Sequence, residues 1–155
     1  MILDYFNMLC ESDSIKSISS SASYIGDILD LSGGLPTDAW GTAITPDKGE
    51  GTTLYWVVQC EDTDFASSGS PVITIDLHTS NSYSTSDLSG TISTLATMVT
   101  DKTPNDGDII GAIPLPKGTI KRYLQVNVAS ASGELTAGKI TSFLTTNPPT
   151  RQYDA

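Results

Sequence analysis

Hydrophobic and polar residues alternate along several short stretches of this chain. In residues 72–79, for example, Ile73, Ile75 and Leu77 share one face, while the side chains between them are polar. Alternation with a period of two predicts a strand with one buried face. Residues 54–61 are apolar on both faces at their start, which is typical of a strand in the middle of a sheet. The same criteria, with an abundance of β-branched residues, predict further strands at 15–20, 23–31, 91–98, 108–115, 121–129 and 138–146.

Turn-forming sequences separate these predicted strands. They combine Gly with Asn, Asp, Ser or Pro, as in Asp47–Gly51, Ser67–Pro71, Asn105–Asp108 and Pro116–Gly118. Residues of these types favour tight turns. Short strands joined by turns predict an all-β fold, and about eight of them suit an antiparallel, jelly-roll-like β-sandwich. At 155 residues, the chain is expected to form a single jelly-roll domain over residues 1–155.

Two terminal segments differ from the predicted strands. The N-terminal arm, residues 1–10, is unusually apolar, and its spacing fits one face of a short helix as well as an extended arm. This arm either packs on the core of its own chain or docks on a neighbouring subunit. The Pro-containing tail, residues 147–155, is predicted to end the last strand near Thr146 and to be extended or disordered unless a partner orders it.

The composition narrows the classes of function. Charged residues make up only 17% of the chain, and 20 Ser and 20 Thr supply much of its polar surface. Acids outnumber bases 18 to 8, and the net charge of −10 disfavours binding to nucleic acid. No apolar run approaches the ~20 residues that span a bilayer, and no signal-peptide pattern opens the chain. We therefore expect neither a nucleic-acid nor a membrane partner, and synthesis in a cytosol that keeps Cys10 and Cys60 reduced.

Residues that would carry catalysis are sparse. The single histidine, His78, is placed beside Asp76 on a polar strand face, and no Gly-x-Ser-x-Gly sequence supplies a nucleophile. We interpret His78 as exposed or as paired across strands. Acidic loops at 61–64 and 105–108 offer oxygen ligands without matching the calcium-binding EF-hand pattern, so we interpret them as solvated loops that cap a strand edge. We predict no enzyme activity, no catalytic residue, no metal site and no cofactor.

Candidate contact residues come from the few basic and aromatic side chains. Lys117, Lys121 and Arg122 lie close together and are followed by Tyr123. This basic cluster either faces an acidic surface of a partner or pairs with an acidic loop of its own chain. Trp40 lies in a loop rich in Gly, Pro and Asp, where it is either an interface anchor or a platform on which a sugar stacks.

The order of several motifs resembles that of a known family. The chain opens Met-Ile-Leu-Asp, continues through Leu54-Tyr55-Trp56-Val57-Val58-Gln59, and later carries Ile113-Pro114-Leu115-Pro116 and Lys121-Arg122-Tyr123-Leu124. In this order it resembles the small jelly-roll capsid cement proteins of tailed bacteriophages, typified by the cement protein of a Bordetella podophage. The resemblance runs over most of residues 1–146, and its most specific part is the stretch from Ile113 to Leu144. The loop 35–53 and the tail carry no inference from it.

The resemblance implies a structural role. It implies a capsid cement, or decoration, protein that binds the outer surface of a phage head and clamps neighbouring major capsid protein subunits. It also implies a homodimer, or alternatively a trimer, located in the virion. The residues that we predict to contact the capsid or another subunit are Ile2, Leu3, Tyr5, Phe6, Trp40, Lys117, Lys121, Arg122 and Tyr123. The alternative function is a carbohydrate-binding β-sandwich, such as a small lectin or a fibre-tip domain, for which Trp40 and the acidic loops are the motivation.

Overall fold

The computed structural model describes residues 8–19, 21–31, 53–62, 65, 72–100, 104–131 and 134–149. Every regular element within these ranges is a β-strand. The strands are β1 (Met8–Ser14), β2 (Ser23–Asp30), β3 (Tyr55–Cys60), β4 (Ile73–Ser80), β5 (Ser82–Ser84), β6 (Asp87–Ser89), β7 (Ser93–Thr100), β8 (Ile109–Pro114), β9 (Tyr123–Ser130) and β10 (Lys139–Thr145).

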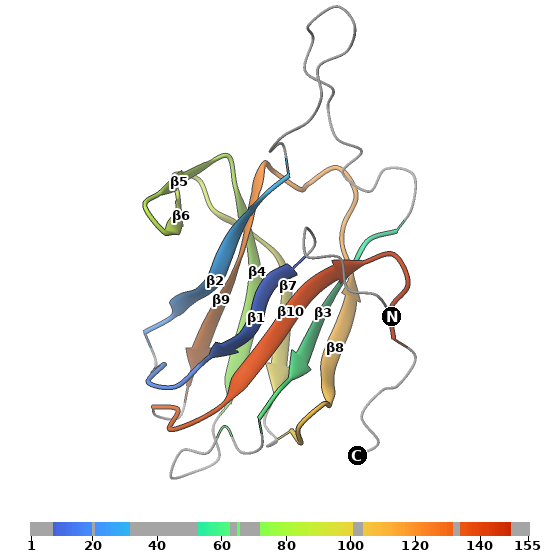
Figure 1. The fold of residues 1–155 in the computed structure, drawn as a ribbon. Helices are drawn as coiled ribbons and strands as arrows, with labels where there is room; N and C mark the ends of the chain where they lie inside the picture. The colour runs from blue at the N-terminus through green and yellow to red at the C-terminus, as the bar shows by residue number, and fades with distance from the viewer. Residues whose placement is uncertain are drawn as a thin grey trace, which may run out of the picture.

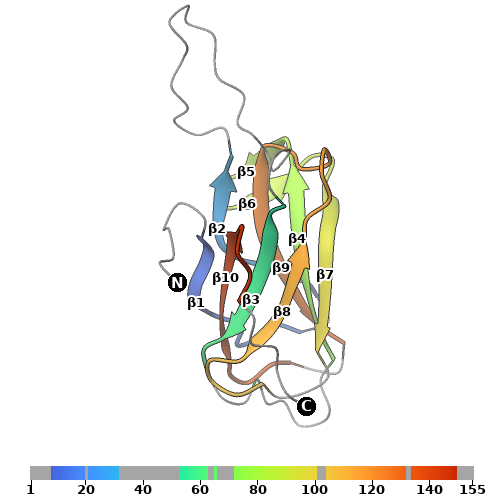
Figure 2. The same cartoon turned by 90° about the vertical axis from the view of Figure 1, so that its right-hand side faces the viewer.

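Two four-stranded sheets pack face to face as a β-sandwich (Figures 1 and 2). One sheet has the strand order β1-β10-β3-β8, and the other has the order β2-β9-β4-β7. All neighbours are antiparallel, and β1, β2, β3 and β4 pair with β10, β9, β8 and β7 respectively. The chain is thus one long antiparallel ribbon rolled into two layers, which is the jelly-roll arrangement. The predicted all-β, jelly-roll-like sandwich is confirmed.

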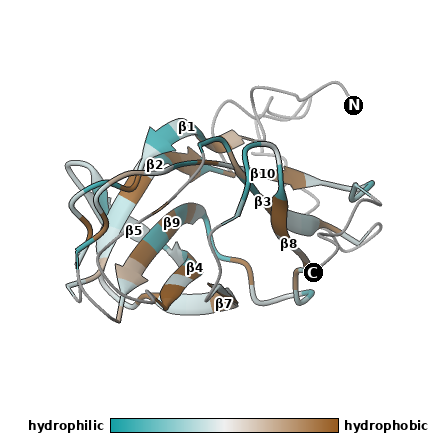
Figure 3. Ribbon diagram, turned by 90° about the horizontal axis from the view of Figure 1, so that it is seen from below, coloured by the Kyte–Doolittle hydropathy of each residue, from teal (hydrophilic) through white to brown (hydrophobic). Residues whose placement is uncertain are grey.

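The core lies between the two layers. Seen end-on, β10, β3 and β8 form one layer, and β9, β4 and β7 form the other (Figure 3). In β4 the alternation acts as the sequence predicts, because Ile73, Ile75 and Leu77 are buried while Thr74 and Asp76 are only half-buried. Trp56 on β3 is fully buried, as expected of an interior strand. The protein therefore buries its apolar residues by sheet-on-sheet packing.

The edge strands β1 and β2 meet along one side of the sandwich. Gly26 of β2 has a φ of +69°, and a Cβ atom built on it would lie 2.2 Å from the carbonyl oxygen of Leu9 on β1. Both strands are irregular: β2 bulges between Ile25 and Leu29, and β1 has two register shifts between Met8 and Asp13. Bulges twist an edge strand and disfavour the addition of a foreign strand.

Two local predictions near the N-terminus are wrong. Residues 15–19 of the predicted strand 15–20 form a turn with a φ of +70° at Ser17, and residue 20 lies outside the described residues. The reason is that Ile15 and Ile18, three residues apart, are both buried, and a strand cannot place such a pair on one face. The short-helix interpretation of residues 1–10 is wrong for residues 8–10, which begin β1 and bury Leu9 in the core.

Candidate contact surface

An exposed ion pair ties the end of β2 to the start of β9. Arg122 donates two hydrogen bonds to Asp30, from Nε to Oδ1 at 3.0 Å and from Nη2 to Oδ2 at 2.8 Å. The backbone reinforces this geometry, because Asp30 pairs with Tyr123 in the sheet and the Leu31 amide donates to the Arg122 carbonyl at 2.9 Å. The hydrogen bonds with Asp30 raise the pKa of the Arg122 guanidinium. A bidentate pair fixes the plane of the guanidinium and so presents it in one orientation.

Two tyrosines extend this cluster outward. The Arg122 Cζ atom lies 4.7 Å from the centroid of the Tyr123 ring. Tyr83 on β5 packs edge-on against Tyr123, with ring centroids 4.9 Å apart and an interplanar angle of 69°. Tyr123 is buried, but Tyr83 is 51% exposed. We call Asp30, Tyr83, Arg122 and Tyr123 the Tyr–Arg cluster; it places an exposed aromatic ring and a fixed cation at the surface.

The β5–β6 hairpin that carries Tyr83 stands beside β2 and β9 (Figure 1). Gln125 of β9 is almost fully buried and anchors the hairpin to the second sheet by two hydrogen bonds. Its Nε2 donates to the Ser86 carbonyl at 2.8 Å, and its Oε1 accepts from the Leu88 amide at 3.1 Å. Leu88 is also buried, so the hairpin is anchored both by the Gln125 side chain and by one of its own. Tyr83 is therefore displayed from a supported element.

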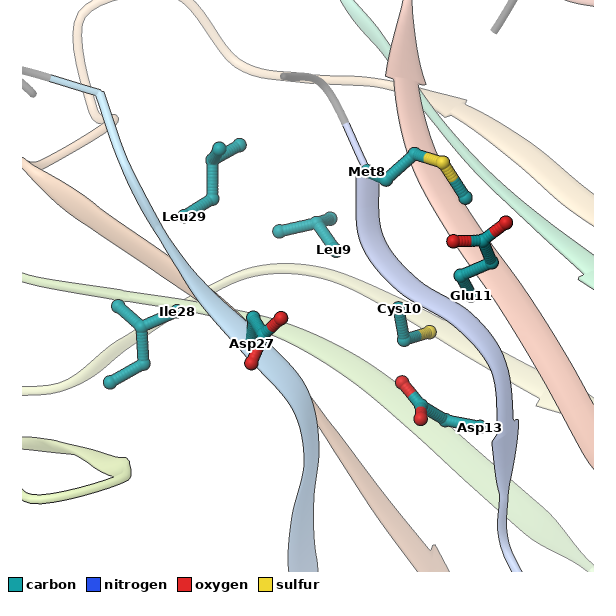
Figure 4. A pocket seen from close by; sticks show the side chains of 8 residues that line it. All are labelled: Met8, Leu9, Cys10, Glu11, Asp13, Asp27, Ile28 and Leu29. Atoms are coloured by element: carbon teal, nitrogen blue, oxygen red, sulfur yellow. The ribbon is translucent and has the colours of Figure 1, made fainter. Parts of the chain in front are cut away.

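Hollows flank β2 on both sides. The first, about 310 Å³, lies between β2 and the hairpin and is lined by Tyr83 and Tyr123 among others. The second, about 400 Å³, lies between β1 and β2, where Leu9 and Leu29 point into the space between the strands (Figure 4). Its lining also includes Glu11, Asp13 and Asp27. The Tyr–Arg cluster thus borders a concave surface, which suits a protein contact.

The predicted contact residues fall into four groups. Arg122 and Tyr123 belong to the Tyr–Arg cluster. Lys121 is turned onto its own chain, because its Nζ donates to the Thr91 carbonyl at 2.7 Å and to the Ser93 hydroxyl at 2.9 Å. Lys117 is exposed in the turn before β9. The remaining predicted residues, which are Ile2, Leu3, Tyr5, Phe6 and Trp40, lie outside the described residues.

Tyr83 was missed by the sequence analysis, together with the short strands β5 and β6. The signal was present, because Ser82-Tyr83-Ser84 and Asp87-Leu88-Ser89 each alternate in polarity around a turn. Three residues are too few to separate a strand from a polar loop by period alone. Gln125, which hydrogen-bonds to the turn and to β6 of this hairpin, lies far away in the sequence.

His78 joins a polar row across the second sheet. The Tyr24 hydroxyl lies 3.0 Å from its Nδ1, and its Nε2 lies 3.9 Å from Asp76 Oδ2. A neutral ring with its proton on Nε2 satisfies both contacts. Burial lowers the pKa of His78 below 6.5, and the carboxylate of Asp76 only partly opposes this. His78 lies beside Asp76 on β4, as predicted, and its partner across strands is Tyr24 on β2.

Because of His78, the free energy of unfolding should decrease as the pH is lowered below 6.5. As the pH drops through 6.5, the unfolded chain takes up a proton on this ring before the folded chain does. The contribution of His78 to the free energy of unfolding therefore decreases until the pH reaches the lower pKa of the folded state. Below that pH, the contribution no longer changes. Denaturant unfolding at pH 7.5 and at pH 5 measures the change in the native protein and in His78→Gln. Equal pH dependence in both proteins would contradict this assignment.

The acidic loop 105–108 is held by local hydrogen bonds, and both cysteines are buried. Asp108 Oδ2 accepts from the Asn105 amide at 2.8 Å and from Asn105 Nδ2 at 3.1 Å, and the Gly107 amide donates to the Cys60 carbonyl. The loop therefore caps the end of β3. Residues 63–64 of the other acidic loop lie outside the described residues. In the described part of the chain, no three potential metal-ligating side chains come together. Cys10 and Cys60 are both free and buried, and burial raises the pKa of Cys10 to about 12.

Comparison with known proteins gives one family. The family model described as Bbp16 matches residues 21–144, a span that runs from just before β2 into β10 and includes the Tyr–Arg cluster. A search of curated proteins finds no match. Among the described residues, no helix is long and apolar enough to span a membrane.

Proposed function

Because the chain belongs to the Bbp16 family of phage structural proteins, we propose that it is a capsid cement protein that binds the outer surface of the phage head. It clamps neighbouring major capsid protein subunits, and it does so as a homodimer or, alternatively, as a trimer. The observation that carries this proposal is the family match over residues 21–144, about four-fifths of the 155-residue chain. A phage structural protein is a component of the virion, and the family is not one of known enzymes.

The Tyr–Arg cluster is the proposed contact surface. Tyr and Arg are, with Trp, the residues most enriched at the positions from which interfaces derive their binding energy. Here the Arg122 side chain is 48% exposed but already fixed by Asp30, so little conformational entropy is lost when it is covered. Tyr83 offers an exposed ring beside the hollow between β2 and the hairpin. The surface is therefore pre-organised for a partner that covers the ring and accepts hydrogen bonds from the guanidinium.

The acidic charge suits the proposed role. A net charge of −10 opposes non-specific association of free protein in solution through mutual repulsion. On a head, many copies bind side by side, so weak single contacts are added by multivalency. The protein can thus remain dispersed before assembly and still be retained on a finished capsid.

The test is binding to heads of the phage that encodes this protein. Heads assembled without it should open at a lower temperature, and added protein should restore their resistance. Tyr83→Ala is expected to weaken binding to such heads about tenfold, since truncating an interface anchor commonly costs more than 1 kcal/mol. The measurement is the bound fraction after sedimentation of heads at increasing protein concentration.

Val99→Ala is the matched control. Val99 lies on β7 and is 61% exposed, so this variant truncates an exposed apolar side chain on a different surface. If neither Tyr83→Ala nor Arg122→Ala weakens binding beyond Val99→Ala, the Tyr–Arg cluster is not the contact. If the native protein does not bind heads at all, the cement function itself is wrong.

The predicted contact role of Ile2, Leu3, Tyr5, Phe6, Trp40, Lys117 and Lys121 stays a prediction. The carbohydrate-binding alternative depended on Trp40 and the acidic loops. Trp40 lies outside the described residues, and Asp108 of one acidic loop is engaged by Asn105. No contact among the described residues favours a sugar over a protein partner.

A further inference from the structure

An apolar groove lies between the edge strands β1 and β2. It is the hollow of about 400 Å³ shown in Figure 4, and we call it the β1–β2 groove. Leu9 and Leu29 point into it from the two strands, and Cys10 also lines it. Leu9 belongs to the buried core, whereas Leu29 is only half-buried. The groove therefore offers an apolar floor on which a side chain of a partner can pack.

Bulges in both strands shape the groove. On β2, residues 26–28 lie opposite a single residue of β9, because the pairing stops at Ile25 and resumes at Leu29. On β1, Ser12 has a φ of +53°, and its amide donates a hydrogen bond to Thr141 Oγ1 at 2.9 Å. Bulges redirect side chains and are frequent beside functional sites. Both strands thus depart from regular pairing where they border the groove.

The rim of the groove is acidic. Glu11, Asp13 and Asp27 line it, and Asp13 points from β1 toward β2 (Figure 4). Asp27 also lines the neighbouring hollow beside the hairpin, together with Asp30. Asp30 is compensated by Arg122, whereas the other three carboxylates form no ion pair with a described residue. Among the described residues that line the two hollows, none is a lysine or an arginine.

These features select the chemistry of an occupant. Lysine and arginine pack their aliphatic stems on apolar surface and keep their charge at its rim, so they match a groove with this floor and this rim. A second copy of the chain, with its net charge of −10, is disfavoured by repulsion. A metal ion is a poor match as well, because no three potential ligands come together among the described residues.

We propose that the β1–β2 groove binds an extended basic segment of a partner protein. A Lys or Arg of that segment contacts Asp27, and an apolar neighbour contacts Leu9 and Leu29. The inference rests on the proposed function in one respect, since that function makes the partner the major capsid protein. Asp27 and Tyr83 line the same hollow on the other side of β2, so one partner can cover the groove and the Tyr–Arg cluster together.

Binding to phage heads at two salt concentrations gives the first test. At about 50 mM NaCl, Asp27→Asn should bind heads roughly threefold to tenfold more weakly than the native protein. Its binding should also change less between about 50 and 300 mM NaCl, because an attraction that salt screens is removed. The measurement is again the bound fraction after sedimentation.

Asp106→Asn is the matched control. Asp106 is exposed in the loop before β8, so this variant removes the same charge from a different surface. It should bind heads as the native protein does. If Asp27→Asn and Asp106→Asn bind equally well, the groove proposal is overturned, although the cement function stands.

A peptide titration tests the chemistry of the groove without heads, and it decides the proposal even if the native protein binds none. The probe is acetyl-Leu-Arg-Leu-Lys-amide added to isotope-labelled protein, and acetyl-Leu-Glu-Leu-Glu-amide is its acidic counterpart. The basic peptide should shift the backbone amide resonances of residues 8–13 and 26–29. The shifts should be as large in Asp106→Asn and less than half as large in Asp27→Asn. An equal response to both peptides, or none at millimolar peptide, would refute binding of a basic segment.

Discussion

Replacing Gly26 with alanine should lower the free energy of unfolding by about 3 kcal/mol. A Cβ atom at this position would lie 2.2 Å from the carbonyl oxygen of Leu9 and 2.6 Å from the Cβ atom of Cys10. The first contact is with backbone, so a rotamer change cannot relieve it, and β1 and β2 must move apart. Overpacking of this kind costs about 1–3 kcal/mol, and alanine at a φ of +69° adds about 1 kcal/mol or more. Denaturant unfolding followed by circular dichroism measures the loss.

Gly118→Ala separates the two contributions to that loss. Gly118 has a φ of +76°, but nothing lies within 4 Å of the position that an added methyl group would take. Only backbone strain is introduced, so the expected cost is about 1 kcal/mol. An effect of Gly26→Ala no larger than that of Gly118→Ala would contradict the close approach of β1 to β2. Since the side of the sandwich closed by these strands also borders the hollow shown in Figure 4, Gly26→Ala should in addition widen that hollow.

Trp56→Ala should cost about 4 kcal/mol, a large share of the ~5–15 kcal/mol by which domains are usually stable. Trp56 is fully buried on β3 and pairs with Leu144 on one side and Ile113 on the other. Its removal opens a cavity between the two sheets. It also deprives the buried Ser142 hydroxyl of a donor, because Trp56 Nε1 donates to Ser142 Oγ at 2.7 Å. The free energy of unfolding is again the quantity to measure.

Trp56→Phe is the matched variant because it keeps most of the ring volume and removes the indole donor. Its expected cost is about 1–3 kcal/mol. Adding Ser142→Ala to Trp56→Phe should recover part of this loss, since the hydroxyl left without its donor is removed as well. If Trp56→Phe were as costly as Trp56→Ala, the indole donor that both variants lose, rather than the volume of the ring, would control the site.

Strands with long alternating stretches were predictable from the sequence, and short or irregular ones were not. β4, β9 and β10 follow their predicted ranges closely, and β10 ends at Thr145, next to the predicted stop at Thr146. The predicted strand at 91–98 lies two residues further on, at Ser93–Thr100. The reason is that Thr and Ser fit either end of a strand equally well. The turn after β1 resembles a strand in sequence because Ile15 and Ile18 reach the core from a backbone that bends at Ser17.

The candidate site was only half predictable. Arg122 and Tyr123 stand out in the sequence as part of a local concentration of basic residues next to an aromatic ring. The sequence left open whether the basic residues face a partner or an acidic group of their own chain. The sequence pattern could not identify Asp30 as the partner of Arg122, because the two residues are 92 positions apart. The same holds for Tyr83, which packs on Tyr123 from a hairpin that hydrogen-bonds to Gln125. Charge composition identified basic residues, but it did not show that Lys121 is turned onto Thr91 and Ser93.

By itself, the sequence determined the fold class of this protein and the face on which each long strand is buried. Those properties depend on local alternation, since side-chain direction reverses at every residue of a strand. The tertiary structure alone decided which strands are neighbours and how β1 and β2 close one side of the sandwich at Gly26. These properties arise from contacts between distant segments, such as Arg122 with Asp30 and Met8 with Phe143, and such contacts leave no period in the chain.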